Sequence, residues 1–182
     1  MFNVSQTKRP SRHFAIAASV LLSPFGIGTL QAANVSSLLQ DAKMSANQLK
    51  TDAVQMESFS RSKQMNWQSH ASQISQIKEH INKAGKVAAQ LEEAKGSAEK
   101  FHQTSIEHIV PTLQELASNT EAIIDHLNKT PNHLWNPTYK EYLASNAELA
   151  GELSQLIDDA VAYDKTKTEM ESLHERLDKL TE

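Results

Sequence analysis

Apolar residues recur every three or four positions through most of the chain after residue 34, which is the spacing of one buried face of an α-helix. Strand-type alternation is missing from the same region, and the strong helix formers Ala, Gln, Glu, Lys and Leu are abundant. The pattern is interrupted three times, so we predict four helices, at about residues 35–58, 63–95, 98–129 and 137–180.

The interruptions contain residues typical of turns and helix ends. A polar cluster occupies residues 58–62, and Gly96 stands where a glycine would end the second helix. Residues 130–135 form the clearest loop, after which Asn136 and Pro137 supply a capping side chain and a proline suited to a first helical position. Pro111 lies inside the third helix, where we expect a kink one turn earlier or, as the alternative, a complete break.

Short connections between long helices place neighbours side by side in opposite directions. We therefore predict an all-α fold, an antiparallel up-down four-helix bundle with long, coiled-coil-like helices, formed by a single domain over residues 33–182. A longer three-helix coiled coil, with the first helix loose, is the alternative. The fourth helix is longer than the others, so it must bend near Gly151 or extend past the bundle, where it is a candidate site for homodimer formation.

The first 32 residues have the features of a secretory signal peptide. Lys8, Arg9 and Arg12 precede an apolar run, and Ala32 and Ala33 provide small residues for cleavage. The run contains Pro24 and is shorter than the roughly 20 apolar residues that a spanning helix needs, so we expect cleavage and no membrane span in the mature chain. The expected location is the periplasm or the medium outside the cell.

Charge and cysteine content exclude several classes of function. Residues 1–32 contain three basic residues and no acidic one, so their removal changes the formal net charge from −4 to −7. An acidic surface repels phosphate backbones, which argues against nucleic acid as a partner. The chain has no cysteine, which excludes disulfides, thiolate metal sites and covalent haem attachment.

A six-residue pattern, Leu-Ala-Ser-Asn-x-Glu, occurs twice, at residues 116–121 and 143–148. Its two copies are equidistant from the loop between the third and fourth helices, so a helical hairpin places them level with each other. Asn119 and Asn146 can then form a hydrogen bond across the interface, which would fix the pairing register of the helices. The alternative is a polar pocket for a small ligand or ion, with Asn119, Thr120 and Asn146 as its walls.

Two Glu-x-x-His triplets, Glu99–His102 and Glu171–His174, are candidate metal ligands, because residues three apart lie on the same side of a helix. In these short motifs alone the chain resembles ferritin-like di-iron proteins. The glutamate content of the chain makes such triplets common by chance, and Glu171 lies beside an apolar stripe that needs no ligand. A b-type haem is a second alternative, with His174 as one axial ligand and a methionine as the other, drawn from Met44, Met56 and Met65.

Aromatic residues cluster near the start of the fourth helix. Trp135, Tyr139 and Tyr142, together with Leu134, form either a hydrophobic plug at that end of the bundle or a patch for a partner protein. The phosphate-binding glycine loop, the Gly-x-Ser-x-Gly elbow and the His-Glu-x-x-His motif are missing from the sequence. We therefore expect a non-enzymatic accessory, scaffold or chaperone-like protein that binds another exported protein; the alternative is a metal- or haem-binding bundle.

Overall fold

A computed structural model describes residues 35–62 and 66–181 of the protein. Four long α-helices account for most of this part of the chain: α1 (Val35–Phe59), α2 (Trp67–Ala94), α3 (Lys100–Lys129) and α4 (Pro137–Thr181). A short 3-10 turn, η1 (Lys95–Ser97), joins α2 to α3, and no strand occurs in these residues. The expected signal peptide, residues 1–32, lies outside the described residues.

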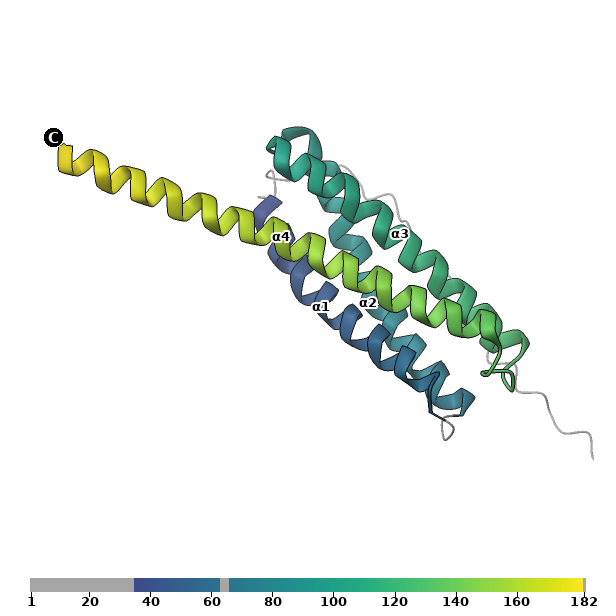
Figure 1. The fold of residues 1–182 in the computed structure, drawn as a ribbon. Helices are drawn as coiled ribbons and strands as arrows, with labels where there is room; N and C mark the ends of the chain where they lie inside the picture. The colour runs from purple at the N-terminus through teal and green to yellow at the C-terminus, as the bar shows by residue number, and fades with distance from the viewer. Residues whose placement is uncertain (1–34, 63–65, 182) are drawn as a thin grey trace, which may run out of the picture.

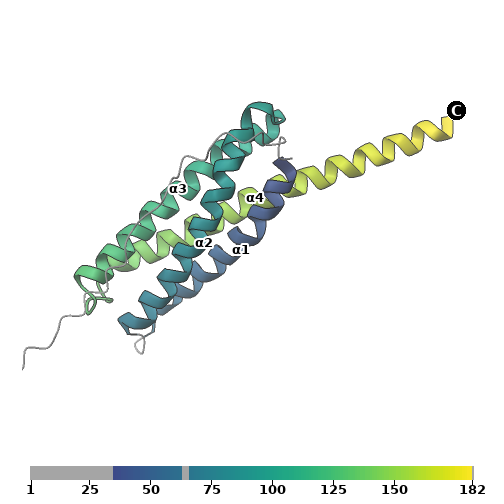
Figure 2. The same ribbon diagram turned by 180° about the vertical axis from the view of Figure 1, so that it is seen from behind.

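The four helices pack side by side in one bundle (Figures 1 and 2), and each of them contacts two neighbours. Both α1 and α3 pack against α2 and α4. His102 near the start of α3 contacts Asp164, whereas Asn119 further along α3 contacts Asn146, so α3 and α4 are paired in opposite senses. The three-helix alternative is wrong, because α1 contributes a full apolar face to the shared core.

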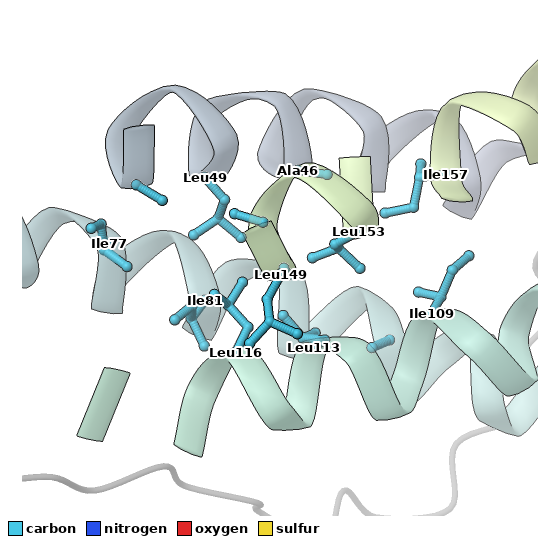
Figure 3. Packing of buried hydrophobic residues seen from close by; sticks show 14 of the residues in the cluster. Ala46, Leu49, Ile77, Ile81, Ile109, Leu113, Leu116, Leu149, Leu153 and Ile157 are labelled. Carbon is cyan, nitrogen blue, oxygen red and sulfur yellow. The ribbon is translucent and has the colours of Figure 1, made fainter. Parts of the chain in front are cut away.

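The core is built from the apolar face of every helix (Figure 3). Alanines such as Ala42, Ala46 and Ala53 alternate with larger residues on α1 and are buried, so that the neighbouring helices approach it closely. The other helices supply mainly leucine and isoleucine. The fully buried large apolar side chains include Leu39, Leu49, Met56, Ile74, Ile77, Leu91, Ile106, Ile109, Leu116, Ile123, Leu143 and Leu153.

Most helix ends follow from local sequence. Asn66 caps α2 by accepting a hydrogen bond from the Ser69 N–H at 3.0 Å, and Asn136 accepts one from the Thr138 N–H at 2.9 Å. Gly96 lies within the 3-10 turn and does not adopt the left-handed conformation of a C′ glycine. The helix α3 continues through Pro111, so a complete break there is wrong.

The helix α4 has 45 residues, against 25, 28 and 30 for the other three, so at 1.5 Å per residue it is about 68 Å long. It extends past the bundle (Figure 1, yellow) instead of ending level with its neighbours. Val161 is its last buried residue, and every residue from Thr168 to Leu180 is exposed. We call residues 162–181 the α4 extension.

Candidate interaction surface

The α4 extension carries four large apolar side chains that are exposed and recur at helical spacing. Met170, Leu173, Leu177 and Leu180 are 66%, 54%, 61% and 83% exposed, respectively. Their spacing of three, four and three residues places them in one stripe along the helix, which is the pattern that an interhelical coiled-coil seam uses. Tyr163 and Thr166 continue the same spacing back toward the bundle.

The charged side chains of the α4 extension are of both signs and lie on either side of the stripe. The basic residues are Lys165, Lys167, Arg176 and Lys179, and the acidic ones are Asp164, Glu169, Glu171, Glu175 and Asp178. An interspersed pattern gives no basic face for a phosphate backbone or an anionic lipid surface. It suits a second helix whose flanking charges are complementary.

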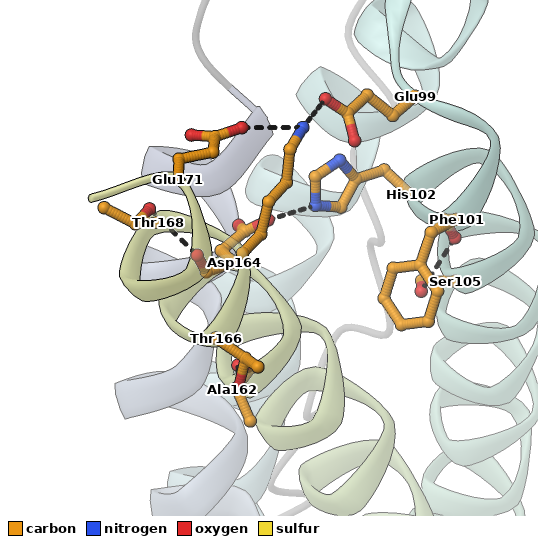
Figure 4. A network of polar contacts seen from close by, with 10 residues as sticks. Glu99, Phe101, His102, Ser105, Ala162, Asp164, Thr166, Thr168 and Glu171 are labelled. Atoms are coloured by element: carbon orange, nitrogen blue, oxygen red, sulfur yellow. Dashed lines mark hydrogen bonds and ion pairs between the residues drawn. The ribbon is translucent and has the colours of Figure 1, made fainter. Parts of the chain in front are cut away.

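The base of the α4 extension is fixed to α3 by polar contacts (Figure 4) and by one aromatic contact. His102 Nε2 lies 2.7 Å from Asp164 Oδ1, and Lys167 donates a hydrogen bond to Glu99, which raises the pKa of Lys167 above its ordinary value. The rings of Phe101 and Tyr163 stack with centroids 3.9 Å apart. These contacts fix the direction in which the helix leaves the bundle.

The four residues expected to bind a metal are not assembled into a ligand set. Lys167 binds Glu99 and lies 4.0 Å from Glu171, while His102 is engaged by Asp164. His174 lies out on the exposed extension, where its nearest carboxylate is Asp178 at 3.6 Å. Within residues 35–62 and 66–181, no group of three or more His, Cys, Asp or Glu side chains is arranged to hold a metal ion.

The haem ligands considered from the sequence do not converge either. Met44 is exposed on α1. Met56 is buried in the core near the C-terminal end of α1. Lys43, next to Met44, forms an ion pair with Asp158, which precedes His174 by 16 residues, about 24 Å along α4, and Met56 lies further away because α1 runs in the opposite direction to α4. Met65 lies outside the described residues.

The asparagine contact expected from the repeated hexad is present. Asn119 Nδ2 donates to Asn146 Oδ1 at 3.0 Å and also to the carbonyl oxygen of Tyr142 at 2.7 Å, and the Thr120 hydroxyl donates to Asn146 Oδ1 at 3.1 Å. Asn146 is buried, and its Nδ2 has no hydrogen-bond partner among the described residues. The cleft beside Thr120, between α2 and α3, has a volume of about 10 Å³, the space of about one water molecule.

The aromatic cluster at the start of α4 is divided between core and surface. Trp135 is 70% exposed, Tyr142 is half-buried, and Tyr139 is fully buried, so Tyr139 cannot belong to a partner patch. The reason is that Pro137 starts the helix and directs Tyr139 between the other helices. There its hydroxyl lies 2.8 Å from His70 Nδ1, and its ring stacks on His126 with centroids 4.5 Å apart.

Burial shifts both partners of this contact toward their neutral forms. It lowers the pKa of His70 and raises the pKa of Tyr139. Both groups are therefore favoured in their neutral forms, in which either the Tyr139 O–H or the His70 Nδ1–H can donate the hydrogen bond between them.

Sequence reasoning did not identify two further polar pairs. His80 Nδ1 lies 2.7 Å from the buried carboxylate of Asp52, which also accepts a hydrogen bond from Gln48 at 3.0 Å. The second is the contact between His70 and Tyr139. Both pairs join residues far apart in the chain, and no short motif links them. The only feature of the sequence that could have indicated these pairs is that His70 and Asp52 fall on the apolar faces of their helices.

Comparison with known protein families, with curated proteins and with solved structures found no match to this chain. In the part of the chain that the structure describes, none of the helices is long and apolar enough to cross a membrane. The candidate site therefore rests on the geometry of the bundle and of the α4 extension.

Proposed function

We propose that this protein is an exported, non-enzymatic, antiparallel up-down helical bundle that acts through protein–protein contacts as an accessory, scaffold or chaperone-like factor. Export follows from the signal-like residues 1–32 and would place the mature chain in the periplasm or outside the cell. The partner is another exported protein or a second copy of this chain. The exposed apolar stripe of the α4 extension carries the proposal.

This stripe supports a binding role because the bundle does not need it. The core is complete without Met170, Leu173, Leu177 and Leu180, all of which extend past the other helices. Most of the stability of a helix in a protein comes from packing its apolar face, so burial of the exposed stripe against a partner helix would stabilise the α4 extension. The polar pairs at its base hold the stripe clear of the bundle.

Site-specific photo-crosslinking in the exporting cell tests this proposal. A benzophenone amino acid at Leu173 should form covalent adducts with a protein, whereas the same probe at Thr168, which lies off the stripe, should form few. Both positions are exposed, so burial of either probe would not explain a difference in labelling. Equal labelling at both positions, or no adduct at Leu173, would contradict the proposal.

A further inference from the structure

The α4 extension has a strict seven-residue repeat along its exposed stripe. Tyr163, Met170 and Leu177 are each seven residues apart, and Thr166, Leu173 and Leu180 form a second series between them. In a heptad written abcdefg, these are the a and d positions of about three heptads, close to the minimum length for a coiled coil. The segment can therefore form six seam layers with another helix.

We propose that the occupant of this seam is the α4 extension of a second copy, docked in the opposite direction about a two-fold axis. This inference rests on the proposed function, since it names the partner of the same surface. In an antiparallel coiled coil an a residue faces a d residue of the other helix. Met170 then packs against Leu173, Leu177 against Thr166, and Leu180 against Tyr163, each pair occurring twice.

The span of the apolar stripe, from Tyr163 to Leu180, selects this register. With Leu180 of the second copy level with Tyr163, all six stripe positions are paired, and the pairing stops where α4 leaves the bundle, just after the buried Val161. A shift of one heptad inward would bring Leu180 of the second copy level with Leu156, which packs against the core, so the second helix would collide with the bundle. A shift of one heptad outward would lose two of the six layers.

The charges beside the seam fit the same register. Glu169 and Arg176 occupy the g positions, which face each other across an antiparallel pair. Glu169 of each copy therefore lies beside Arg176 of the other, which gives two symmetric opposite-charge contacts. A single chain cannot make these contacts by itself, because residues seven apart on one helix are two turns away from each other.

The base of the α4 extension offers a surface for the tip of the second copy. Phe101 and Tyr163 are stacked on each other, yet they remain 37% and 36% exposed. In the antiparallel register, Leu180 of the second copy packs on this aromatic pair. A parallel dimer would instead require Tyr163 to face Tyr163, with both bundles crowded at one end and with Phe101 already covering one face of each ring.

Cysteine pairing tests the orientation, because the protein contains no cysteine of its own. Thr166→Cys and Leu177→Cys variants are purified, one of them isotopically labelled, then mixed and oxidised. The antiparallel register predicts that disulfide-linked dimers contain one copy of each variant, since these positions share a layer. Thr168→Cys, on the outer face, serves as the matched control and should remain uncrosslinked.

Charge reversal provides a second test that needs no crosslink. Glu169→Arg and Arg176→Glu should each weaken self-association by roughly fivefold. An equimolar mixture of the two variants should regain wild-type affinity, because each mixed dimer restores both opposite-charge contacts. Ser172→Glu, which adds a charge away from the seam, should leave the dissociation constant within about twofold of wild type.

The outcomes separate this inference from the proposed function. Linked dimers of Thr166→Cys with itself and of Leu177→Cys with itself would establish a parallel pair and overturn the antiparallel register. A protein that is monomeric by sedimentation at every concentration, but gives photo-adducts at Leu173 in cells, would overturn the second copy as occupant. The α4 extension would then remain a docking helix for a different protein.

Discussion

Asn146 shows how a single polar residue is accommodated in an apolar seam. Its Oδ1 accepts two hydrogen bonds from α3, but its buried Nδ2 has no partner among the described residues. A buried donor without a partner costs about 1–3 kcal/mol, so this residue lowers stability while it fixes the level at which α3 and α4 meet. Its role is therefore best interpreted as specifying the register.

Replacing this residue tests that interpretation. Asn146→Leu combined with Thr120→Val should keep the helix content and raise the Tm by a few degrees, because the two apolar side chains fill the seam and the buried Thr120 hydroxyl, which donates to Asn146, is removed together with its acceptor. Circular dichroism during heating measures both quantities. Asn128→Leu, at an exposed position near the end of α3, is the control and should leave the Tm unchanged. A fall in Tm with the double variant would mean that the amide network is a net stabilising feature.

His70 makes the stability of the bundle depend on pH. Burial lowers its pKa in the folded state below the value of the unfolded chain, so the unfolded chain binds the proton more readily. The free energy of unfolding should therefore fall as the pH decreases below about 6.5, by at most about 1.4 kcal/mol per pH unit from this residue. The titratable groups that contact it are Tyr139 directly and His126 through the Tyr139 ring.

His70→Gln removes this titration while retaining a polar partner for the Tyr139 hydroxyl. Urea unfolding between pH 7.5 and 5 should show a smaller loss of stability in the variant than in the wild type. His108→Gln replaces an exposed histidine and should reproduce the wild-type dependence. If His70→Gln and the wild type lose stability equally over this range, His70 is not the group responsible.

Not every residue contact could be foreseen. The hexad repeat identified Asn119 and Asn146 because both helices flank one loop, so symmetry about that loop set their pairing. Tyr139 was grouped with Trp135 by proximity in sequence, although only the start of α4 at Pro137 decides that one faces inward and the other outward. Its partner His70 lies 69 residues away in the chain, a separation that local patterns cannot bridge.

At the scale of the elements, apolar spacing predicted the four helices to within a few residues of their ends. The largest difference is at α2, which begins at Trp67 because Asn66 caps it. The candidate metal ligands are separated for a reason also at this scale. Glu171 and His174 lie on a part of α4 that faces none of the other described helices, and among the described residues no group of three or more possible ligands is brought together.

The α4 extension should be separable from the bundle. A chain that ends after Lys167 keeps the contacts with Glu99, His102 and Phe101, and residues 168–180, which it lacks, are all exposed. At low protein concentration, where self-association does not contribute, its Tm should lie within about 3 °C of the full chain. A decrease of 10 °C or more would show that residues 168–182 stabilise the bundle directly.

At the scale of the whole molecule, the described part of the protein is a four-helix bundle in which one helix, α4, extends past the other three. From the length of α4 the sequence predicted that this helix would either bend or extend past the bundle. In the structure it extends past the bundle (Figure 2). The bundle fixes the direction of the α4 extension. The heptad repeat places its apolar side chains in one stripe that can pack against a second helix. The two bundles of an antiparallel dimer would lie at opposite ends of a shared central coiled coil.

Hydrogen exchange of residues 168–180, measured by mass spectrometry at two protein concentrations, tests the central claim most directly. If these residues form a seam with a second copy, their amides should be protected and the protection should increase with concentration. Leu173→Glu should abolish that protection, and Ser172→Glu should retain it. Exchange at the rate of an unstructured peptide at both concentrations would contradict the claim that this helix pairs with a second copy.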